Sequence, residues 1–321
     1  MALTGKNTHR DNPLVKIAVA SGKGGTGKTT VSVNLYHFSN RLWKNTLLVD
    51  CDVEEPNDAL FFKDLKIAGK KEVFLPVPKI EVTKCTFCKK CSEWCEFNAI
   101  TVVSKLKFAE VNTSLCHSCG ACLHACHFGA INERKQSLGW ITHYEGTGNG
   151  NEDSLIEGRL KIGSALQTML IQRLKNEISA NSGVIIYDAP PGTSCSVVET
   201  VADVDYVVLV TEPTPFGLHD LKIAVDLVKQ LQIPFGIVIN KARLGNNAVY
   251  EFIDNNNIEL LGEIPFSKGY SADCASGNIL EKISVETENV YHNIIKNLKI
   301  KLKNWQPKSP YLAEKEAPEK L

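Results

Sequence analysis

The chain has 321 residues, 43% of them hydrophobic and 22% charged, and its 36 Lys and Arg balance its 36 Asp and Glu. This composition is typical of a globular protein of about two domains, and the zero net charge argues against a protein that mainly coats a nucleic-acid backbone. Since no apolar run reaches the ~18 residues of a membrane span and the N-terminal segment lacks the apolar stretch of a signal peptide, we expect a cytoplasmic protein with neither a nucleic acid nor a membrane as partner.

The first predicted strand spans residues 14–20 and leads at once into SGKGGTGKTT and a helical pattern to about residue 42. Strand, glycine-rich loop and helix in this order are the context of a phosphate-binding loop, and residues 22–29 fit G-x-x-x-x-G-K-[ST]. A chance glycine-rich turn is the alternative. The glycines let backbone amides converge on phosphate oxygens, while Lys28 adds a positive charge and Thr29 is the expected Mg²⁺ ligand. The predicted nucleotide-binding residues of this loop are Gly22, Gly24, Gly25, Thr26, Gly27, Lys28, Thr29 and Thr30.

A second apolar run, residues 46–49, ends at Asp50-Cys51-Asp52. Carboxylates beside a triphosphate serve a metal ion or the attacking water, because they would otherwise repel the anion. We therefore expect Asp50 and Asp52 at the nucleotide, and Cys51 between them with its side chain in the core.

Residues 79–135 interrupt the alternation of strands and helices and hold eight of the eleven cysteines. In a reducing compartment, clustered thiols favour metal binding over disulfides. Both runs have the spacing C-x2-C-x2-C-x3-C, which is typical of bacterial ferredoxins, where the fourth Cys of each run ligates the other cluster. The sequence thus predicts two [4Fe–4S] clusters, one on Cys85, Cys88, Cys91 and Cys126 and the other on Cys95, Cys116, Cys119 and Cys122.

Structural zinc is the competing interpretation, but it commonly uses two separated C-x2-C pairs. The usual Pro after the fourth Cys is replaced by Glu96 and His127, which changes the polarity near the clusters. We interpret His117, His124 and His127 as surface or packing residues, since the thiolate count is complete. Short strands are expected at residues 99–103 and 107–111, and a loop at 145–153.

The rest of the chain alternates short Val- and Ile-rich runs with helical segments. Such runs are typical of parallel strands that are covered on both faces, and the alternation indicates a doubly wound α/β sheet. Ligands bind at the carboxyl ends of these strands, where Asp188 and Asn240 stand. The predicted strands span residues 184–187, 206–210 and 235–239, and the predicted helices span 217–231 and 246–256.

The last apolar stripe, in residues 291–305, contains Ile294, Leu298, Leu302 and Trp305 at helical spacing. It predicts a helix packed on the sheet, with a membrane-surface helix as the alternative. From Pro307 the chain is rich in Lys, Glu and Pro, so we expect disorder over 306–321.

The loop sequence KGGTGKTT resembles the deviant Walker A loop of the MinD/ParA/nitrogenase-iron-protein family of dimeric P-loop ATPases. The resemblance implies an ATP-bound homodimer in which Lys23 reaches the partner's nucleotide. It also implies that Asp52 activates the attacking water, that Asp50 and Asp188 hold hydrated Mg²⁺ with Thr29, that Gly192 marks a second switch and that Asn240 reads adenine. Lys23, Lys28 and Asp52 are then the catalytic residues.

Over roughly residues 14–285, the chain resembles MinD-like ATPases that carry an inserted two-cluster ferredoxin domain. We expect a mostly parallel, doubly wound P-loop sheet, made of residues 1–78 and 136–305, with a small α+β ferredoxin-like insertion at 79–135. The expected cofactors are ATP or ADP, Mg²⁺ and two [4Fe–4S] clusters. The expected function is ATP hydrolysis coupled to electron transfer with a protein partner. The alternatives are an iron–sulfur assembly factor that delivers clusters to an apo-protein, and a spatial-organisation ATPase with redox sensing.

Two cysteines outside the runs stay open. We interpret Cys195, in the second switch, as a small packing residue, and the alternative is a ligand of a cluster that bridges two protomers. The sequence suggests no partner for Cys274.

Overall fold

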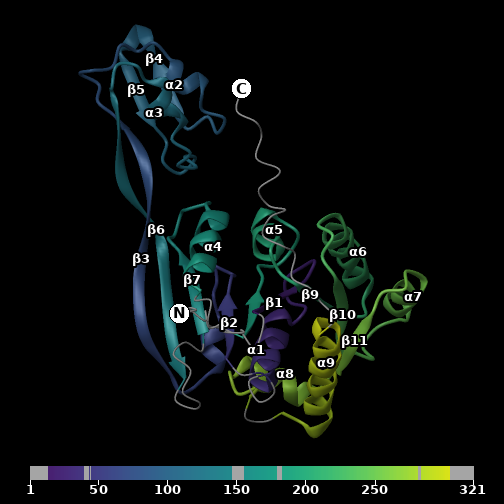
Figure 1. Ribbon diagram of the computed structural model, residues 1–321. Helices are drawn as coiled ribbons and strands as arrows, with labels where there is room; N and C mark the ends of the chain where they lie inside the picture. The colour runs from purple at the N-terminus through teal and green to yellow at the C-terminus, as the bar shows by residue number, and fades with distance from the viewer. Residues whose placement is uncertain are drawn as a thin grey trace, which may run out of the picture. The chain divides into compact units, whose positions relative to one another are not determined.

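The computed structural model describes residues 14–39, 43, 45–146, 155–178, 183–280 and 283–303 (Figure 1). The chain divides into two compact units. The first comprises Met1–Val49, Leu60–Lys63 and Ala180–Leu321, and the second comprises Asp50–Ala59 and Asp64–Ser179. A short 3-10 helix, η1 (Asp58–Phe61), lies where the chain passes from one to the other. The phosphate loop belongs to the first unit, and both cysteine runs belong to the second.

A parallel sheet forms the centre of the first unit. Its strands run in the order β11-β10-β9-β1-β8-β2. They are β1 (Val15–Ala20), β2 (Thr46–Asp50), β8 (Val184–Asp188), β9 (Tyr206–Thr211), β10 (Phe235–Ala242) and β11 (Leu260–Pro265). Strand β1 pairs in parallel with β8 and β9, and β10 pairs in parallel with β9 and β11. The mostly parallel α/β sheet predicted from the Val- and Ile-rich runs is confirmed.

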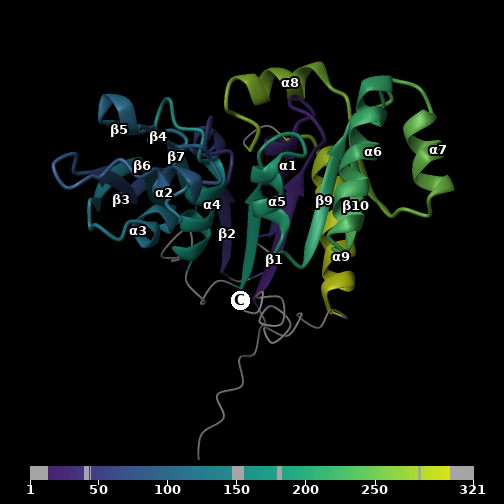
Figure 2. The ribbon, with the colours of Figure 1, turned by 90° about the horizontal axis from the view of Figure 1, so that it is seen from above.

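Every residue of β2, β8 and β9 is buried, which requires cover on both faces of the sheet. Figure 2 shows the helices of this unit beside its strands. These helices are α1 (Lys28–Ser39), α5 (Cys195–Val201), α6 (Pro215–Gln230), α7 (Ala248–Asn255), α8 (Lys268–Ala275) and α9 (Val285–Lys303). The sequence placed α6 and α7 within two residues of these bounds.

Helix α9 packs on the sheet, as its apolar stripe predicted. Ile294 and Leu298 are buried, and a Cβ placed on Gly262 of β11 would lie 2.7 Å from Cγ1 of Ile294. The ring of Tyr291 also stacks on Phe38 of α1. Trp305 and the predicted disordered tail lie outside the described residues. Within the described part of the chain, no helix has both the length and the apolar character that crossing a membrane requires.

The second unit contains an antiparallel sheet in the order β7-β6-β3. Its strands are β3 (Leu65–Ile80), β6 (Ile131–Gly146) and β7 (Leu155–Leu160), and helix α4 (Gln167–Asn176) follows β7. The 16-residue strands β3 and β6 pair from Leu65 with Gly146 to Ile80 with Ile131. This two-stranded ribbon was not expected from the sequence, and residues 145 and 146, expected in a loop, belong to β6. Residues 147–153 of that loop lie outside the described residues.

The cysteine-rich segment lies between the ends of β3 and β6. It contains α2 (Lys90–Glu93), β4 (Ile100–Val103), the 3-10 turn η2 (Ser104–Leu106), β5 (Phe108–Val111) and α3 (Ala121–Ala125). Strands β4 and β5 form the antiparallel hairpin that the two predicted strands indicate. The predicted limits 79 and 135 therefore fall inside the long ribbon rather than at its base.

Candidate functional site

The phosphate loop joins β1 to α1 in a conformation that requires glycine. Gly25 and Gly27 have φ of 77° and 88°, in the left-handed region that side chains disfavour. A Cβ on Gly27 would lie 2.1 Å from Nδ2 of Asn240, and one on Gly22 would lie 2.2 Å from the carbonyl oxygen of Asp220. The glycines predicted to expose backbone amides thus also permit close packing from behind the loop.

Asp188, at the end of β8, is fully buried, and its carboxylate contacts polar side chains of the loop and of α1. Lys28 Nζ lies 2.8 Å from its Oδ1, and Thr29 Oγ1 donates to its Oδ2 over 2.7 Å. Ser32, one helical turn after Lys28, donates to Oδ1 over 2.7 Å. The structure therefore brings the predicted residues Lys28, Thr29 and Asp188 together. Ser32 was not predicted, although its i+4 spacing from Lys28 places both residues on one face of α1.

Lys23 is held by a residue that the sequence analysis did not single out. Its Nζ lies 2.7 Å from Glu212 Oε1, and Lys241 Nζ lies 3.0 Å from the other carboxylate oxygen. Burial acts to raise the pKa of Glu212, but the hydrogen bonds from Lys23 and Lys241 outweigh it and hold this pKa below its ordinary value. Glu212 directly follows β9. The expectation that ligand-binding residues lie at the carboxyl ends of parallel strands, which indicated Asp188, therefore applied to Glu212 as well.

Asn240 lies against the phosphate loop. Its Nδ2 donates to the carbonyl of Thr26 over 2.7 Å, and Lys241 Nζ donates to the carbonyl of Gly25 over 3.0 Å. Both residues lie inside β10, where the register shifts and Lys241 has φ of 54°. This bulge turns consecutive side chains toward the loop. The adenine-reading role of Asn240 stays a prediction.

Asp50 is buried and organises the segment that follows β2. Its Oδ1 accepts the backbone N–H of Asp52 over 3.0 Å, and its Oδ2 accepts those of Asn57 and Asp58 over 2.8 and 3.1 Å. Hydrogen bonds from backbone amides favour an ionised carboxylate. The roles predicted for Asp50 at Mg²⁺ and for Asp52 at water stay predictions.

The isolated cysteines have different environments. Cys51 is buried, as predicted, and Cys274 accepts a hydrogen bond of 3.9 Å from Thr30 Oγ1. Cys195 is exposed at the first residue of α5. Its interpretation as a packing residue is therefore wrong, because the start of this helix leaves its side chain in solvent. Gly192, in the predicted second switch, has φ of 89° and donates its N–H to Ser21.

Two cavities in the second unit are each lined by four cysteines drawn from both runs. The first cavity is lined by Cys85, Cys88, Cys91 and Cys126, and the second by Cys95, Cys116, Cys119 and Cys122. The remaining lining of the first cavity is largely apolar, with Ile80, Phe87 and Ile131 among its residues. The cavities thus group the thiols into the two sets that the sequence predicted, with the fourth Cys of each run in the other set.

The two runs form an internal repeat with an offset of 31 residues, as from Cys85 to Cys116. Phe87 and Ser118 donate backbone N–H groups to Cys85 and Cys116, and Ala99 and Ala130 donate to Cys95 and Cys126. Their connections cross: Glu81 N donates to Ala130 O over 2.7 Å, and Asn112 N donates to Ala99 O over 2.8 Å. These backbone hydrogen bonds join the two halves of the repeat, which explains why each set contains cysteines from both runs.

The chemistry of the donor set fits a metal cluster. Burial raises the pKa of the Cys91 and Cys116 thiols, and burial together with the neighbouring Cys116 and Cys119 raises that of Cys122 to about 11. Four adjacent thiolates in such a place need positive charge to offset burial and mutual repulsion, and iron supplies it. In the second set, His117 stacks on Phe97 with ring centroids 3.7 Å apart, in agreement with its interpretation as a packing residue.

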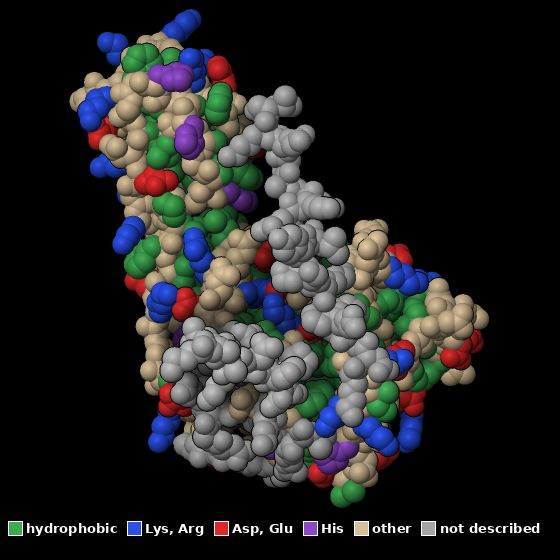
Figure 3. Space-filling view, viewed as in Figure 1, with side chains coloured by type: hydrophobic (Ala, Val, Ile, Leu, Met, Phe, Trp, Pro, Cys, Tyr) green, Lys and Arg blue, Asp and Glu red, His purple; other side chains and the backbone are tan. Residues whose placement is uncertain are grey.

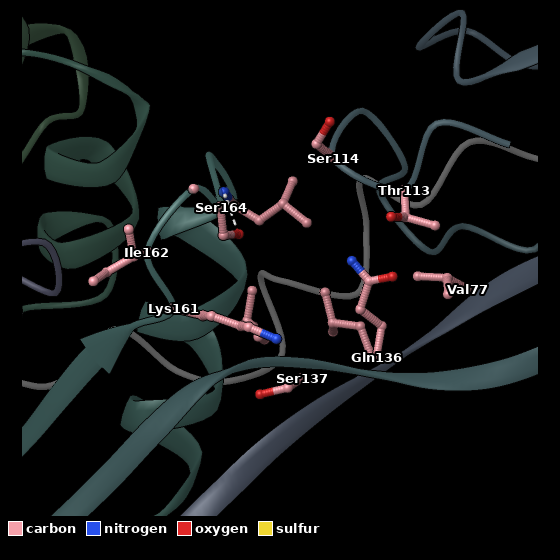
Figure 4. Close-up of a pocket in the computed structure, with 12 residues that line it drawn as sticks. Val77, Thr113, Ser114, Gln136, Ser137, Lys161, Ile162 and Ser164 are labelled. Carbon is pink, nitrogen blue, oxygen red and sulfur yellow. Dashed lines mark hydrogen bonds between the residues drawn. The ribbon is translucent and has the colours of Figure 1, made fainter.

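A third cavity of the second unit is lined by both polar and apolar residues, and this lining contains no cysteine (Figure 4). Gln136 and Ser137 of β6 face Lys161 and Ser164 of the loop after β7, and Thr113 and Ser114 approach from the cysteine-rich segment. Within the loop, Ser164 N donates to Lys161 O, and its Oγ accepts the N–H of Leu166. This cavity lies beside the second cysteine set, since residue 114 precedes Cys116 by two positions.

Comparison with known proteins places the sequence in a family. Residues 17–280 match the CobQ/CobB/MinD/ParA nucleotide binding domain. An uncharacterized protein of Methanocaldococcus jannaschii is 37% identical over 232 residues, which cover 71% of this chain and 80% of that protein. The iron-sulfur cluster carrier protein of Pyrococcus abyssi is 25% identical over 78% of this chain and 73% of its own length.

Among solved structures, the septum site-determining protein MinD of Pyrococcus horikoshii, complexed with Mg-ADP, is similar in fold. The TM-score is 0.55 at 16% sequence identity, over 91% of this chain and 98% of that chain. At this identity the similarity supports the fold alone.

Proposed function

We infer the function from the family: the chain belongs to the CobQ/CobB/MinD/ParA nucleotide-binding family, and it is a nucleotide-binding protein of the ParA/MinD type. We propose that it binds and hydrolyses ATP as a homodimer. We further propose that its nucleotide state gates electron transfer between two [4Fe–4S] clusters and a protein partner.

The nucleotide half of the proposal rests on the contacts of Lys28 and Asp188. In the described conformation Lys28 is paired with the buried carboxylate of Asp188. A bound triphosphate offers Lys28 a stronger anion at the converging amides of the loop. Lys28 then turns to the phosphates, while Asp188 and Thr29 remain as oxygen ligands that would hold Mg²⁺. Because Lys28 exchanges one anion for another, no positive charge is left buried and unpaired at any stage.

The dimer half of the proposal rests on Lys23. Its ammonium group is bound to Glu212 of its own chain, so it must leave this carboxylate before it can reach a partner's nucleotide. Lys241 stays beside Glu212 and compensates its charge when Lys23 departs. The energy of this exchange comes from contacts that only the triphosphate form offers, which is the usual origin of a nucleotide switch.

The single observation that carries the redox half is the sharing of cysteines between the runs. Each cavity receives three thiols from one run and a fourth from the other, and backbone N–H groups donate to the sulfur atoms of two cysteines in each run. Clusters bound there supply reversible one-electron transfer. The residues of the protein hold the sulfur ligands in place and shield them with apolar side chains.

The experiment is an anaerobic purification of the full chain, followed by iron analysis, EPR and ATPase assays. We expect about eight iron atoms per chain, a reducible EPR signal, and an ATPase rate that differs between dithionite-reduced and oxidised protein. Zinc in place of iron contradicts the cluster assignment, and equal rates in the two redox states contradict the coupling.

A second candidate function is delivery of iron–sulfur clusters, because the relative from Pyrococcus abyssi is called an iron-sulfur cluster carrier protein. In this case the clusters are cargo rather than resident cofactors. Transfer of iron from the loaded chain to an apo-ferredoxin, accelerated by ATP, supports delivery. Retention of all iron through many redox cycles supports electron transfer instead.

A further inference from the structure

The two cysteine cavities differ in the charge of the residues around them. The internal repeat allows equivalent positions of the two runs to be compared. Lys84, Lys89 and Lys90 of the first run correspond to Leu115, Gly120 and Ala121 of the second, 31 residues later. The lining of the first cavity includes Lys89 and no acidic residue, whereas that of the second includes Glu133 and no lysine. Equivalent positions that have the same backbone role therefore carry positive charge at one set only.

The positive charge lies where a partner can reach it. Cys88, Lys89 and Lys90 are consecutive exposed residues at the start of α2. The hydroxyl of Ser104 donates to the carbonyl of Phe87 over 2.7 Å, which fixes the turn carrying Lys105 and Lys107 to the same loop. We name as the lysine rim the exposed residues Lys84, Lys89, Lys90, Lys105 and Lys107. Figure 3 shows blue side chains along this end of the second unit.

The acidic residues of the segment do not cancel this difference. Glu81 pairs with Lys84 over 2.6 Å and leaves the other lysines of the rim unaffected. Glu93 ends α2, and Glu96 directly follows Cys95, which belongs to the second set. Glu96 and the cavity residue Glu133 therefore place negative charge at the second set. Two exposed aromatic side chains, Trp94 and Phe128, with 58% and 54% of their surface accessible, add the apolar contact that docking surfaces combine with charge.

We propose that the first cysteine set is the site where electrons leave the protein, and that the lysine rim docks an acidic one-electron carrier protein over it. The proposal rests on the proposed function, since it requires a cluster in each set. With clusters bound, Cys85, Cys88, Cys91 and Cys126 would hold the one that passes from [4Fe–4S]⁺ to [4Fe–4S]²⁺ as the carrier gains one electron. The cluster on the second set, reduced by an external low-potential donor, would then supply one electron to the first. Nearby lysines stabilise the more negative, reduced state, so the first cluster has the higher potential of the two.

The test uses the full chain with both clusters loaded, reduced with dithionite and freed of excess reductant. Two oxidants of opposite charge serve as probes: anthraquinone-2,6-disulfonate as the anion and hexaammineruthenium(III) as the cation. At low ionic strength, we expect the Lys89→Gln/Lys90→Gln variant to react with the anion about tenfold more slowly than the parent, and with the cation no more slowly. Added salt should remove this difference, and polyglutamate should inhibit the parent much more than the variant.

Two controls come from the chain itself. Lys229→Gln/Lys296→Gln removes two exposed lysines from the first unit, α6 and α9, and should leave both rates unchanged. Ala121→Lys adds a lysine to the second set at the position equivalent to Lys90, and should raise the rate with the anion. In a redox titration followed by EPR, Lys89→Gln/Lys90→Gln should lower the midpoint potential of one cluster only.

The outcomes separate this proposal from the proposed function. Absence of eight irons in the parent overturns the function itself. Full loading together with equal anion rates in the parent and the Lys89→Gln/Lys90→Gln variant overturns the docking site. A fall of both midpoint potentials by the same amount overturns the assignment of the lysine rim to the first cluster.

Discussion

The phosphate loop and the cysteine cavities represent two ways of preparing a binding site. In the first unit, the charged side chains already have partners in the protein: Lys28 pairs with Asp188, and Lys23 with Glu212. In the second unit, the sulfur atoms of each set are assembled by the backbone, but burial opposes their ionisation. The lysines of the nucleotide site thus form ion pairs that a bound ligand would replace. The cysteine sites instead need a metal cation to offset the charge of their thiolates, and the chain does not provide one.

This difference has a thermodynamic consequence. In the first unit, a nucleotide would exchange existing ion pairs for contacts with its phosphates, so it can act as a switch. Binding of iron to thiols that are otherwise protonated contributes directly to folding, because the unfolded chain has no such site. We therefore expect the second unit to depend on its cofactor far more than the first depends on its ligand.

The largest expected effect is that of iron removal. Chelation of iron under anaerobic conditions should strongly destabilise the cysteine-rich segment between β3 and β6 without abolishing its fold, while the stability of the parallel sheet of the first unit stays unchanged. Hydrogen exchange of residues 81–130 should become fast, and that of β8 and β9 should stay slow. Equal protection of the cysteine-rich segment with and without iron would show that the apolar cluster around Ile100 and Ile131 suffices to fold it.

The second effect concerns the buried ion pair. Lys28→Met should abolish ATP binding and lower the free energy of unfolding by about 3 kcal/mol, because it leaves the Asp188 carboxylate buried beside an apolar side chain. Thr29 and Ser32 still donate to Asp188, which limits the loss. Chemical denaturation of the nucleotide-free chain measures this change.

Two variants test the cause of this loss. Lys28→Met/Asp188→Asn should recover most of the stability without restoring ATP binding. Lys16→Met, which breaks the exposed pair with Asp203, should cost less than about 1 kcal/mol. Similar losses for the buried and the exposed pair would contradict the contrast between the two sites.

A third, smaller effect is the alkaline sensitivity of the iron-free form. The pKa of Cys122 is about 11 in the folded chain, against an ordinary value of 9.0. The folded state therefore binds more protons between these values, and its stability should be fully present below pH 9 and fall as the pH rises toward 11. The difference in unfolding free energy between the parent and Cys122→Ser, measured across this range, isolates the thiol from lysine titration. A difference that is independent of pH would contradict the shift.

The smallest effect is expected for Glu212→Gln. This change removes the charge that holds Lys23, and the single amide oxygen of Gln can accept from only one of the two lysines, Lys23 and Lys241, that pair with Glu212. A partly exposed pair contributes about 1 kcal/mol or less. Lys23 is then released more readily, so the ATP concentration that gives half-maximal dimer should fall a few-fold in light scattering. Lys241→Gln, which affects the same carboxylate from the other side, serves as the control. A weaker ATP-dependent dimer in Glu212→Gln would show that Glu212 assists Lys23 instead of restraining it.

Residue type and spacing along the chain were enough to predict the glycine loop, the Val- and Ile-rich strands and the two cysteine runs, because these signals are local. A phosphate loop requires consecutive backbone conformations that few sequences allow, and a buried parallel strand requires apolar residues on both faces. Short ranges along the chain therefore predicted the parallel strands and the phosphate loop, but not the pairing of Lys28 with Asp188, which are 160 residues apart.

Tertiary structure alone decided the contacts between distant segments. Glu212 and Lys23 are 189 residues apart, and the pair forms only because β9 and β1 are neighbours in the sheet. The ribbon of β3 and β6 escaped prediction because β3 contains Lys and two prolines, Pro76 and Pro78, which are tolerated at a strand that ends the sheet. Only part of β3 carries an apolar pattern, the alternating buried residues Val73, Leu75 and Val77, and most of the residues before them are exposed, so only the folded chain shows the full strand.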